Sequence, residues 1–475
     1  MTLKQDTLTH LFDKCAFPLA CAGAFLLELK LALSYACLIP LITLWLLKSR
    51  PELPQVLRQS RAVTAPFLFF AASLIVSSFF GLNPWRSLRA VPALLFFPCA
   101  VLVYREIGLA GQPEQKKRPL QILFCLLTGQ AVSALYTVLE GSLSGKLPRM
   151  FLGRVSESGQ IAMTLLIGGG LLIFYQLQRH ASSRLEAGAS SVLKLPNLRS
   201  ALLWGVLNSI LFCAAAFAGH LPLLSAFHRP LLMAAACSLC FCLALSSAYF
   251  KHSVNEDQSA AAFQFLLGSI ILPLLAGALL INLKRGPWAG VFIGGSILLF
   301  FYGRRLLIPL LALTILLVTL VTPIRDRLAQ SSRDFFMTGG RSVIWEIGLE
   351  LSTRYPLGVG FRNSPILQKY SLEIPPEMRH FHNNLINILV ETGWLGLGLY
   401  LWWIFSTLKF CFQTPPQTKA RPLIVAIGCA ILSWQCAGMV EYNFGDSEVL
   451  MVAYILLGVL LSLSATGRNE YPNQP

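Results

Sequence analysis

Two histidines lie just before an apolar run in the segment RHFHNNLINILVETGWLG, residues 379–396. His380 and His382 are two residues apart, so they would not share one face of a helix. A helix that starts near Phe381 would place His382 in its first turn, at a membrane surface. Because a neutral imidazole near pH 7 can accept a proton, His382 is a candidate general base, with Asn383 beside it to orient the reacting groups. A structural role at a helix end is the alternative.

Arginines gather in the polar stretch that precedes this segment. Arg325, Arg327 and Arg333 are followed by Arg341. The planar guanidinium pairs with phosphate oxygens in a bidentate way, so the cluster is suited to a phosphorylated group. A solvated loop that also binds anionic lipid is the alternative interpretation.

A further basic pair, Lys284 and Arg285, stands in INLKRGPWAG between two apolar runs. Such a pair can anchor a helix end at the membrane interface together with Trp288. It can equally supply Arg285 to an anion site. The residues alone leave both interpretations open.

Two histidines without further acidic or cysteine ligands at a metal-binding spacing make a weak metal site. The cysteine-rich stretch CSLCFC, residues 237–242, lies inside an apolar run and is interpreted as membrane packing. No DxD motif occurs in the chain. We therefore expect neither a metal ion nor another cofactor.

Composition places these residues in a membrane protein. The chain has 475 residues, of which 55% are hydrophobic and 13% charged, with a mean hydropathy of +0.63. Soluble domains carry about 25% charged residues. Apolar runs close to the roughly 20 residues needed to cross about 30 Å of hydrocarbon recur from end to end, without the alternation of β-barrel strands. The predicted fold is therefore all-α and polytopic, with about 12–14 transmembrane helices.

We predict fourteen spans from the apolar runs. They cover residues 12–28, 31–47, 62–80, 90–104, 119–139, 159–177, 200–219, 230–250, 260–283, 287–303, 306–323, 384–405, 422–440 and 447–464.

The lysines and arginines predict the orientation. With the N-terminus inside, 21 of the 38 fall in inner loops and 17 in outer loops, and eight of those 17 lie in the long loop 324–383. Long loops are nearly exempt from the positive-inside rule. We therefore expect both termini in the cytoplasm and the long loop in the periplasm. Because the basic residues are distributed between spans, the net charge of +16 does not indicate a nucleic-acid partner.

Three regions follow from these spans: N-terminal transmembrane helices at 1–323, a periplasmic loop domain of short helices at 324–383, and C-terminal transmembrane helices at 384–475. Within the loop, GGRSVIWEIGLELSTRYP has apolar residues near helical spacing between Gly340 and Pro356. They are Val343, Ile344, Ile347 and Leu351. We predict an amphipathic helix that lies near the membrane surface.

Three motifs in order resemble those of the O-antigen ligase and O-antigen polymerase superfamily. LKRGPWAG is similar to its serine-arginine-glycine-tryptophan segment, and GGRSVIWEIGLELSTRYPLGVGF to its loop with glycine-arginine, tryptophan and proline-glycine-valine-glycine. HFHNNLINILVETGWLGLGLYL is similar to its histidine-any-histidine-asparagine segment. The resemblance covers residues 281–400, and the rest of the chain matches in topology alone.

The resemblance implies a GT-C-like, metal-independent glycosyltransferase at the outer face of the bacterial inner (cytoplasmic) membrane. Its donor would be a glycan on undecaprenyl pyrophosphate, and its acceptor lipid A–core or another glycan. His382 would remove the acceptor proton, and His380 would support it or contact substrate. The implied substrate-binding residues are Arg285, Arg341, Arg325, Arg327 and Asn383.

The sequence departs from the family pattern in its first half. Lys284 stands where the family has serine, and VSESGQIAM, residues 155–163, replaces an asparagine-containing motif. The spans at 200–250 resemble an extra hairpin. Arg229, in FHRPLLM, is therefore a rival to Arg285 for the first site arginine.

Several functions are compatible with these motifs. An O-antigen ligase is slightly favoured by the moderate loop with its many arginines. A polysaccharide polymerase and a protein O-oligosaccharyltransferase are the alternatives within the superfamily. A transporter or flippase is the alternative of a different class, but it would need more polar residues inside the spans than Asn208, Gln264 and Gln435.

Overall fold

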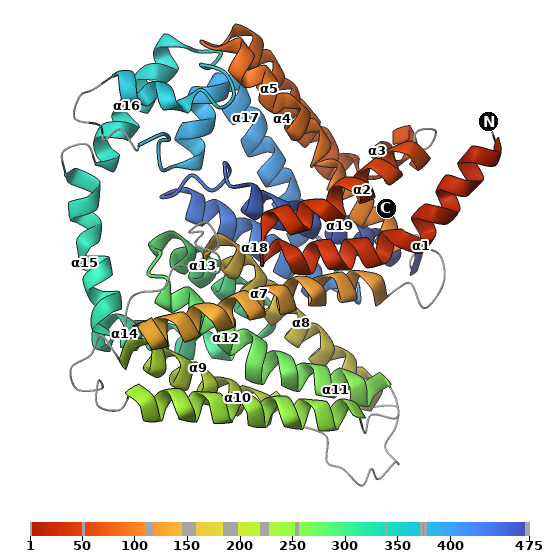
Figure 1. The fold of residues 1–475 in the computed structure, drawn as a ribbon, viewed down its shortest axis with the longest axis vertical. Coiled ribbons are helices and arrows are strands. Elements are labelled where there is room, and N and C mark those ends of the chain that lie inside the picture. The colour runs from red at the N-terminus through yellow and green to blue at the C-terminus, as the bar shows by residue number, and fades with distance from the viewer. Residues whose placement is uncertain are drawn as a thin grey trace.

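A computed structural model describes residues 2–49, 53–109, 117–144, 158–183, 198–218, 228–251, 256–337, 340–370, 374 and 378–470. Over these residues the chain forms helices joined by turns and loops, and no β-strand (Figure 1). The prediction of an all-α polytopic membrane protein is confirmed.

The helices follow one another along the whole chain. The N-terminal half contains α1 (Thr2–Leu27), α2 (Leu31–Ser49), α3 (Leu53–Gln59), α4 (Arg61–Phe80), α5 (Pro84–Phe96), α6 (Cys99–Leu109), α7 (Arg118–Ser144), α8 (Ser158–Ser183), α9 (Leu198–Ala218) and α10 (His228–Lys251). The C-terminal half contains α11 (Glu256–Leu266), the π-helical turn η4 (Leu267–Ile271), α12 (Leu272–Ile281), α13 (Arg285–Tyr302), the short η5 (Arg304–Leu306), α14 (Leu307–Leu320), α15 (Thr322–Phe336), α16 (Arg341–Arg354), η6 (Ser364–Lys369), α17 (Asn384–Phe412), α18 (Arg421–Gly438) and α19 (Ser447–Glu470).

Each predicted span coincides with one helix or with two adjoining helices. Among the described residues, eleven helices are long and apolar enough to cross a membrane, or up to twelve if the bent pair α14–α15 counts as one span. This count is lower than the fourteen predicted spans. The predicted span 200–219 coincides with α9, which is not among the eleven, and 287–303 belongs to α13, whose first turn contains Arg285 and Pro287.

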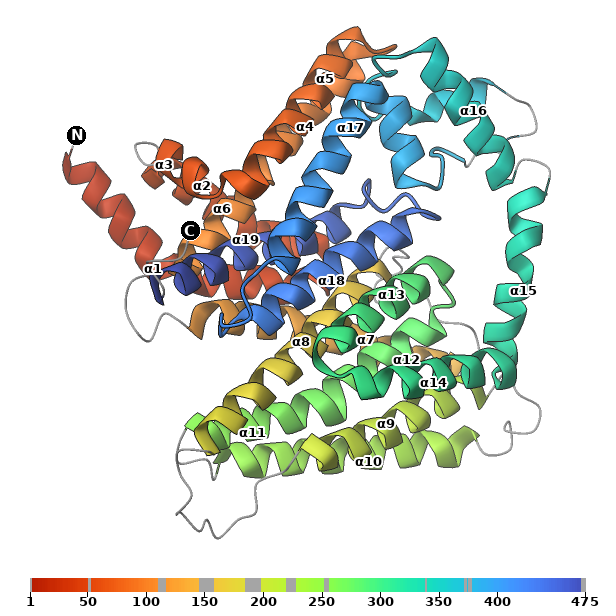
Figure 2. The ribbon, with the colours of Figure 1, turned by 180° about the vertical axis from the view of Figure 1, so that it is seen from behind.

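The two ends of the described chain lie on the same side of the molecule, opposite α15 and α16 (Figures 1 and 2). The compartment of each terminus stays a prediction.

Small residues bring α13 close to α18. A Cβ atom added to Gly290 would lie 2.5 Å from the carbonyl oxygen of Ser433, and one added to Gly294 would lie 2.9 Å from that of Cys429. Close approach through glycine is a general means of packing membrane helices, because apolar burial alone gives little attraction between helices in lipid. This contact holds the N-terminus of α13 beside the loop that follows α18.

The long loop begins with a sharp bend and has a small core of its own. The axes of α14 and α15 differ by 86°. The predicted helix between Gly340 and Pro356 is confirmed as α16, which begins at Arg341 and ends at Arg354. Its apolar side chains pack into a second core, separate from that of the bundle, made of Ile344, Leu351, Val359, Leu367, Ile374, Phe381 and Val390.

Helix α17 breaks near its start, and the loop is bonded to the break. Gly393 has φ 71° and ψ −176°, which are not helical values. The carbonyl oxygens of Val390 and Glu391 accept hydrogen bonds from the backbone N–H groups of Val359 (2.8 Å) and Gly360 (3.1 Å). These bonds fix the loop on the first turns of α17, and so position the residues just before that helix.

Candidate active site

Arg285 and Arg327 share one carboxylate. Arg285, at the start of α13, donates from Nη1 to Ser331 Oγ at 2.8 Å and from Nη2 to Asp334 Oδ2 at 2.8 Å. Arg327, on α15, donates from Nη1 to the same Asp334 oxygen at 3.1 Å. The Arg285 side chain is only 13% exposed. The two arginines therefore lie side by side, although 42 positions separate them in the sequence.

The turn before α13 is anchored on both sides. Leu283 has a left-handed backbone, with φ 52°, and its carbonyl oxygen accepts a hydrogen bond from Arg327 Nε at 3.3 Å. Lys284 forms an ion pair with Glu441, at 3.3 Å between Nζ and Oε1. Since Glu441 lies between α18 and α19, this pair ties the α13 turn to the C-terminal helices.

Arg341, the first residue of α16, lies within electrostatic reach of this group. Burial lowers the pKa of its guanidinium, the Glu441 and Asp334 carboxylates oppose that shift, and Arg285 and Arg327 add to it. Counting Lys284 with the three arginines, four cations face the carboxyl groups of Asp334 and Glu441 and, near Lys284, that of Asp446, which still leaves an excess of positive charge. Such a group attracts an anion.

The two histidines contact each other beside this group. Their ring centroids are 4.2 Å apart, and the His382 backbone N–H donates to His380 Nδ1 at 3.3 Å. His382 has φ 48°, a conformation that non-glycine residues rarely adopt and that clusters at functional sites. His380 also lies 5.5 Å from the Tyr442 ring, between centroids.

The contacts of His382 select its tautomer. Nε2 lies 3.0 Å from the Met378 sulfur. A thioether has no hydrogen to donate, so Nε2 carries the proton in this contact and Nδ1 holds the lone pair. The proton-accepting atom of His382 is then Nδ1.

The surroundings keep His382 neutral. Burial, followed by the charges of His380, Arg341 and Lys284, lowers its pKa from 6.5 to about 3. Burial also lowers the pKa of His380, while Glu441 opposes and Lys284 adds to that shift. Both shifts favour the unprotonated ring near pH 7, and a negative charge bound among the arginines would raise the pKa of His382.

The Asn383 side chain forms hydrogen bonds with the start of α17 rather than with His382 in this structure. Its Oδ1 accepts from the backbone N–H groups of Leu385 (2.8 Å) and Ile386 (3.2 Å), and its Nδ2 donates to the Met439 carbonyl oxygen at 3.0 Å. This is an N-cap, so α17 begins at Asn384, after His382. The expectation that the helix starts near Phe381, with His382 in its first turn, is wrong by three residues because Asn383 ends the non-helical segment.

Two predicted arginines lie apart from the group. Arg325 is exposed and pairs with the neighbouring Asp326 at 3.5 Å. Arg229 is exposed at the start of α10, which lies at the opposite end of the molecule from α16 (Figure 1). The structure thus unites His380, His382, Arg285, Arg327 and Arg341, and favours Arg285 over Arg229 as the first site arginine.

Sequence reasoning missed the partners of these residues. Asp334 contacts Arg285, Met378 contacts His382, and Glu441 pairs with Lys284 next to Arg285. The acid-rich turn EYNFGDSE after α18, residues 441–448, was the available signal for Glu441. Over the described residues, no group of three or more His, Cys, Asp or Glu side chains is placed to hold a metal ion, and metal independence stays a prediction.

Comparison with known families decides the relationship. Residues 270–401 match the family model described as O-antigen ligase. Over these residues the match supports the resemblance to the O-antigen ligase superfamily. No curated protein matches it.

The matched O-antigen ligase domain runs from η4 into α17 and so contains both histidines and all three clustered arginines. The match of this domain points to a membrane glycosyltransferase-like activity. Glu441 lies outside the matched residues, and its pairing with Lys284 is a feature of this fold.

Proposed function

We propose that this protein transfers a glycan from undecaprenyl pyrophosphate to an acceptor at the periplasmic face of the bacterial inner membrane, most simply as an O-antigen ligase with lipid A–core as acceptor. One observation carries the proposal. Within the O-antigen ligase domain, the neutral His382 lies within electrostatic reach of Arg341, which in turn lies among Arg285 and Arg327. A proton acceptor and an anion site therefore stand side by side.

The reaction assigns a task to each group. The acceptor hydroxyl oxygen forms a bond to the anomeric carbon of the glycan, while the bond between that carbon and the pyrophosphate oxygen breaks. The hydroxyl proton passes to Nδ1 of His382, a contribution of roughly 10²–10⁴-fold in rate. Negative charge grows on the departing undecaprenyl pyrophosphate, where the arginines stabilise it electrostatically.

The proposed lipid-linked donor also accounts for the exposed apolar side chains near the site. Large apolar side chains are exposed along α14, among them Ile308 (78%), Ile315 (55%) and Leu320 (69%). This lipid-facing helix leads to the bend where α15 begins, and α15 contains Arg327 and Asp334. A prenyl chain in the bilayer could lie along α14 while its pyrophosphate meets the arginines.

A deletion strain tests the proposal through its glycolipids. If the protein is a ligase, polymer accumulates on undecaprenol and none is attached to lipid A–core. Single repeat units on lipid A–core would instead identify a polymerase, and normal glycolipids with unglycosylated protein an O-oligosaccharyltransferase. Unchanged glycans of all three kinds would overturn the proposal and favour the transporter alternative.

We propose further that α15 and α16 face the periplasm and both termini face the cytoplasm.

Cysteine labelling tests this orientation. In a background without native cysteines, Ser332→Cys on α15 should react with an impermeant thiol reagent added to intact cells. Gln417→Cys, in the loop between α17 and α18, should react only after the cells are opened. Both residues are exposed, so access alone separates them. The reverse labelling pattern would contradict this orientation. Glu114, a further inner position between α6 and α7, lies outside the described residues.

A further inference from the structure

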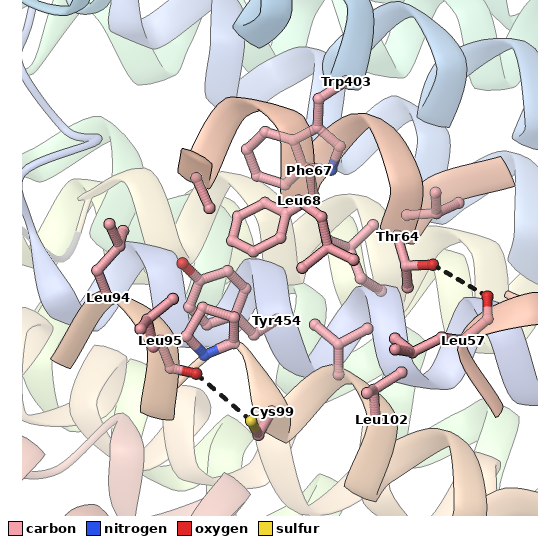
Figure 3. A pocket seen from close by; sticks show the side chains of 15 residues that line it. Leu57, Thr64, Phe67, Leu68, Leu94, Leu95, Cys99, Leu102, Trp403 and Tyr454 are labelled. Carbon is pink, nitrogen blue, oxygen red and sulfur yellow. Dashed lines mark hydrogen bonds between the residues drawn. The ribbon is translucent and has the colours of Figure 1, made fainter. Parts of the chain in front are cut away.

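A cavity lies among α4, α5, α6, α17 and α19, and Figure 3 shows the side chains that line it. Its walls are almost wholly apolar, and include Phe67, Leu68, Leu94, Trp403, Tyr454 and Leu457. Two of its polar side chains are bonded to the backbone: Thr64 Oγ1 donates to the Ser60 carbonyl oxygen at 3.0 Å, and Cys99 Sγ to that of Leu95 at 3.4 Å. The cavity therefore suits a hydrocarbon chain.

The rim of the cavity faces the surroundings of the bundle. Leu68 is 47% exposed and Leu95 is 49% exposed, and both line the cavity. Since α4 and the α5–α6 pair are candidate membrane spans, the surroundings at this depth are lipid. A lipid chain can enter from the side without crossing water.

The cavity is remote from the candidate active site. It is lined by Val63 to Ala71, in the first half of α4, whereas the other end of α4 meets the long loop, where the Leu82 N–H donates to the Val359 carbonyl oxygen at 2.9 Å. Leu68 and Gly81 are thus about 20 Å apart along the helix, at 1.5 Å per residue. A headgroup at this cavity would lie on the side of the chain termini.

Two arginines near one end of the cavity favour a lipid with a negatively charged headgroup. Arg61, Thr64, Leu68 and Ala71 are three or four residues apart and so share one face of α4, and the last three line the cavity. Arg61 is exposed one turn beyond Thr64, and Arg58 is exposed next to the lining residue Leu57. Neither arginine forms an ion pair with a described residue. We propose that this cavity holds one acyl chain of an anionic phospholipid whose headgroup phosphate binds Arg61 and Arg58.

Lipid retention tests this site directly. The protein is purified in detergent, its bound lipid is extracted and identified by mass spectrometry, and its Tm is measured with added phosphatidylglycerol or phosphatidylcholine. We expect the wild type to retain anionic phospholipid and phosphatidylglycerol to raise the Tm in a concentration-dependent way. Phosphatidylcholine should raise it less.

Two variants and one control locate the lipid. Arg61→Ala should abolish the preference for phosphatidylglycerol, and Ala71→Phe, which fills the cavity, should reduce retained lipid severalfold. Arg305→Ala removes an exposed arginine of η5 that does not line the cavity, and should behave as the wild type.

Three results would overturn the proposal. They are equal stabilisation of the wild type by both phospholipids, unchanged retention in both cavity variants, and displacement of phosphatidylglycerol by undecaprenyl phosphate at equal concentration. The last result would make the cavity a prenyl-chain site instead. If Ala71→Phe fails to fold, Arg61→Ala still decides the question.

Discussion

His382→Ala should lower the rate of glycan transfer by roughly 10²–10⁴-fold, with normal amounts of protein in the membrane. The substitution removes the ring whose Nδ1 accepts the proton. It leaves the helix start intact, because Asn383 supplies the N-cap of α17. The measurement is transfer by purified protein from a lipid-linked donor, normalised to protein amount.

His380→Ala is the matched comparison. His380 Nδ1 accepts the His382 backbone N–H and so supports the left-handed conformation of His382 without accepting the substrate proton. A smaller loss is expected. Near-normal transfer by His382→Ala, or a larger loss in His380→Ala, would remove His382 from the role of base.

The pH profile gives a second measurement of the same assignment. Because His382 must be unprotonated to act, activity falls as pH drops through its pKa. The acid limb of kcat/KM reports the free enzyme, in which burial and the nearby cations lower this pKa to about 3. Bound pyrophosphate adds negative charge and raises the pKa, so the acid limb of kcat should lie at higher pH. Identical limbs for both would contradict a base beside the pyrophosphate.

Arg285→Lys and Arg341→Lys should each lose most activity, while excess EDTA leaves the wild type active. Arg285 uses two nitrogens at once, toward Ser331 and Asp334. A lysine keeps the charge but has no planar fork, so it cannot hold two oxygens in this way. At a mere interfacial anchor lysine would suffice, because snorkelling needs only a long stem and a charge.

Arg325→Lys is the control, since Arg325 is exposed and forms its ion pair with the neighbouring Asp326; the activity of this variant should stay close to that of the wild type. Asp334→Asn is the companion variant. A bound pyrophosphate must accept hydrogen bonds from the arginine N–H groups that donate to Asp334 in this structure. Removing the Asp334 charge should therefore lower the KM for the donor.

Activity that stops in EDTA and returns with magnesium, or full activity in both lysine variants, would refute the arginine mechanism.

The sequence by itself determined the membrane-spanning pattern and the ends of α16. A run of apolar residues must avoid water wherever it lies, and a helix is the local structure that satisfies its backbone in lipid, so each predicted span coincides with a helix. Gly340 and Pro356 likewise bound α16 through local backbone preferences. The superfamily was also readable, because its motifs are short and follow one another in order within residues 270–401.

Only the tertiary structure decided which of the candidate residues meet. Arg285 reaches Asp334 across 49 positions, and Lys284 reaches Glu441 across 157. In the sequence, Arg229 and Arg325 are as plausible as anion-binding residues as Arg285 and Arg327. The fold places both of them away from the candidate active site. Local patterns also left open whether Asn383 contacts substrate or caps α17, because its amide can do either. The choice depends on where Met439 lies, and that position follows from the packing of α17 and α18 rather than from the residues next to Asn383.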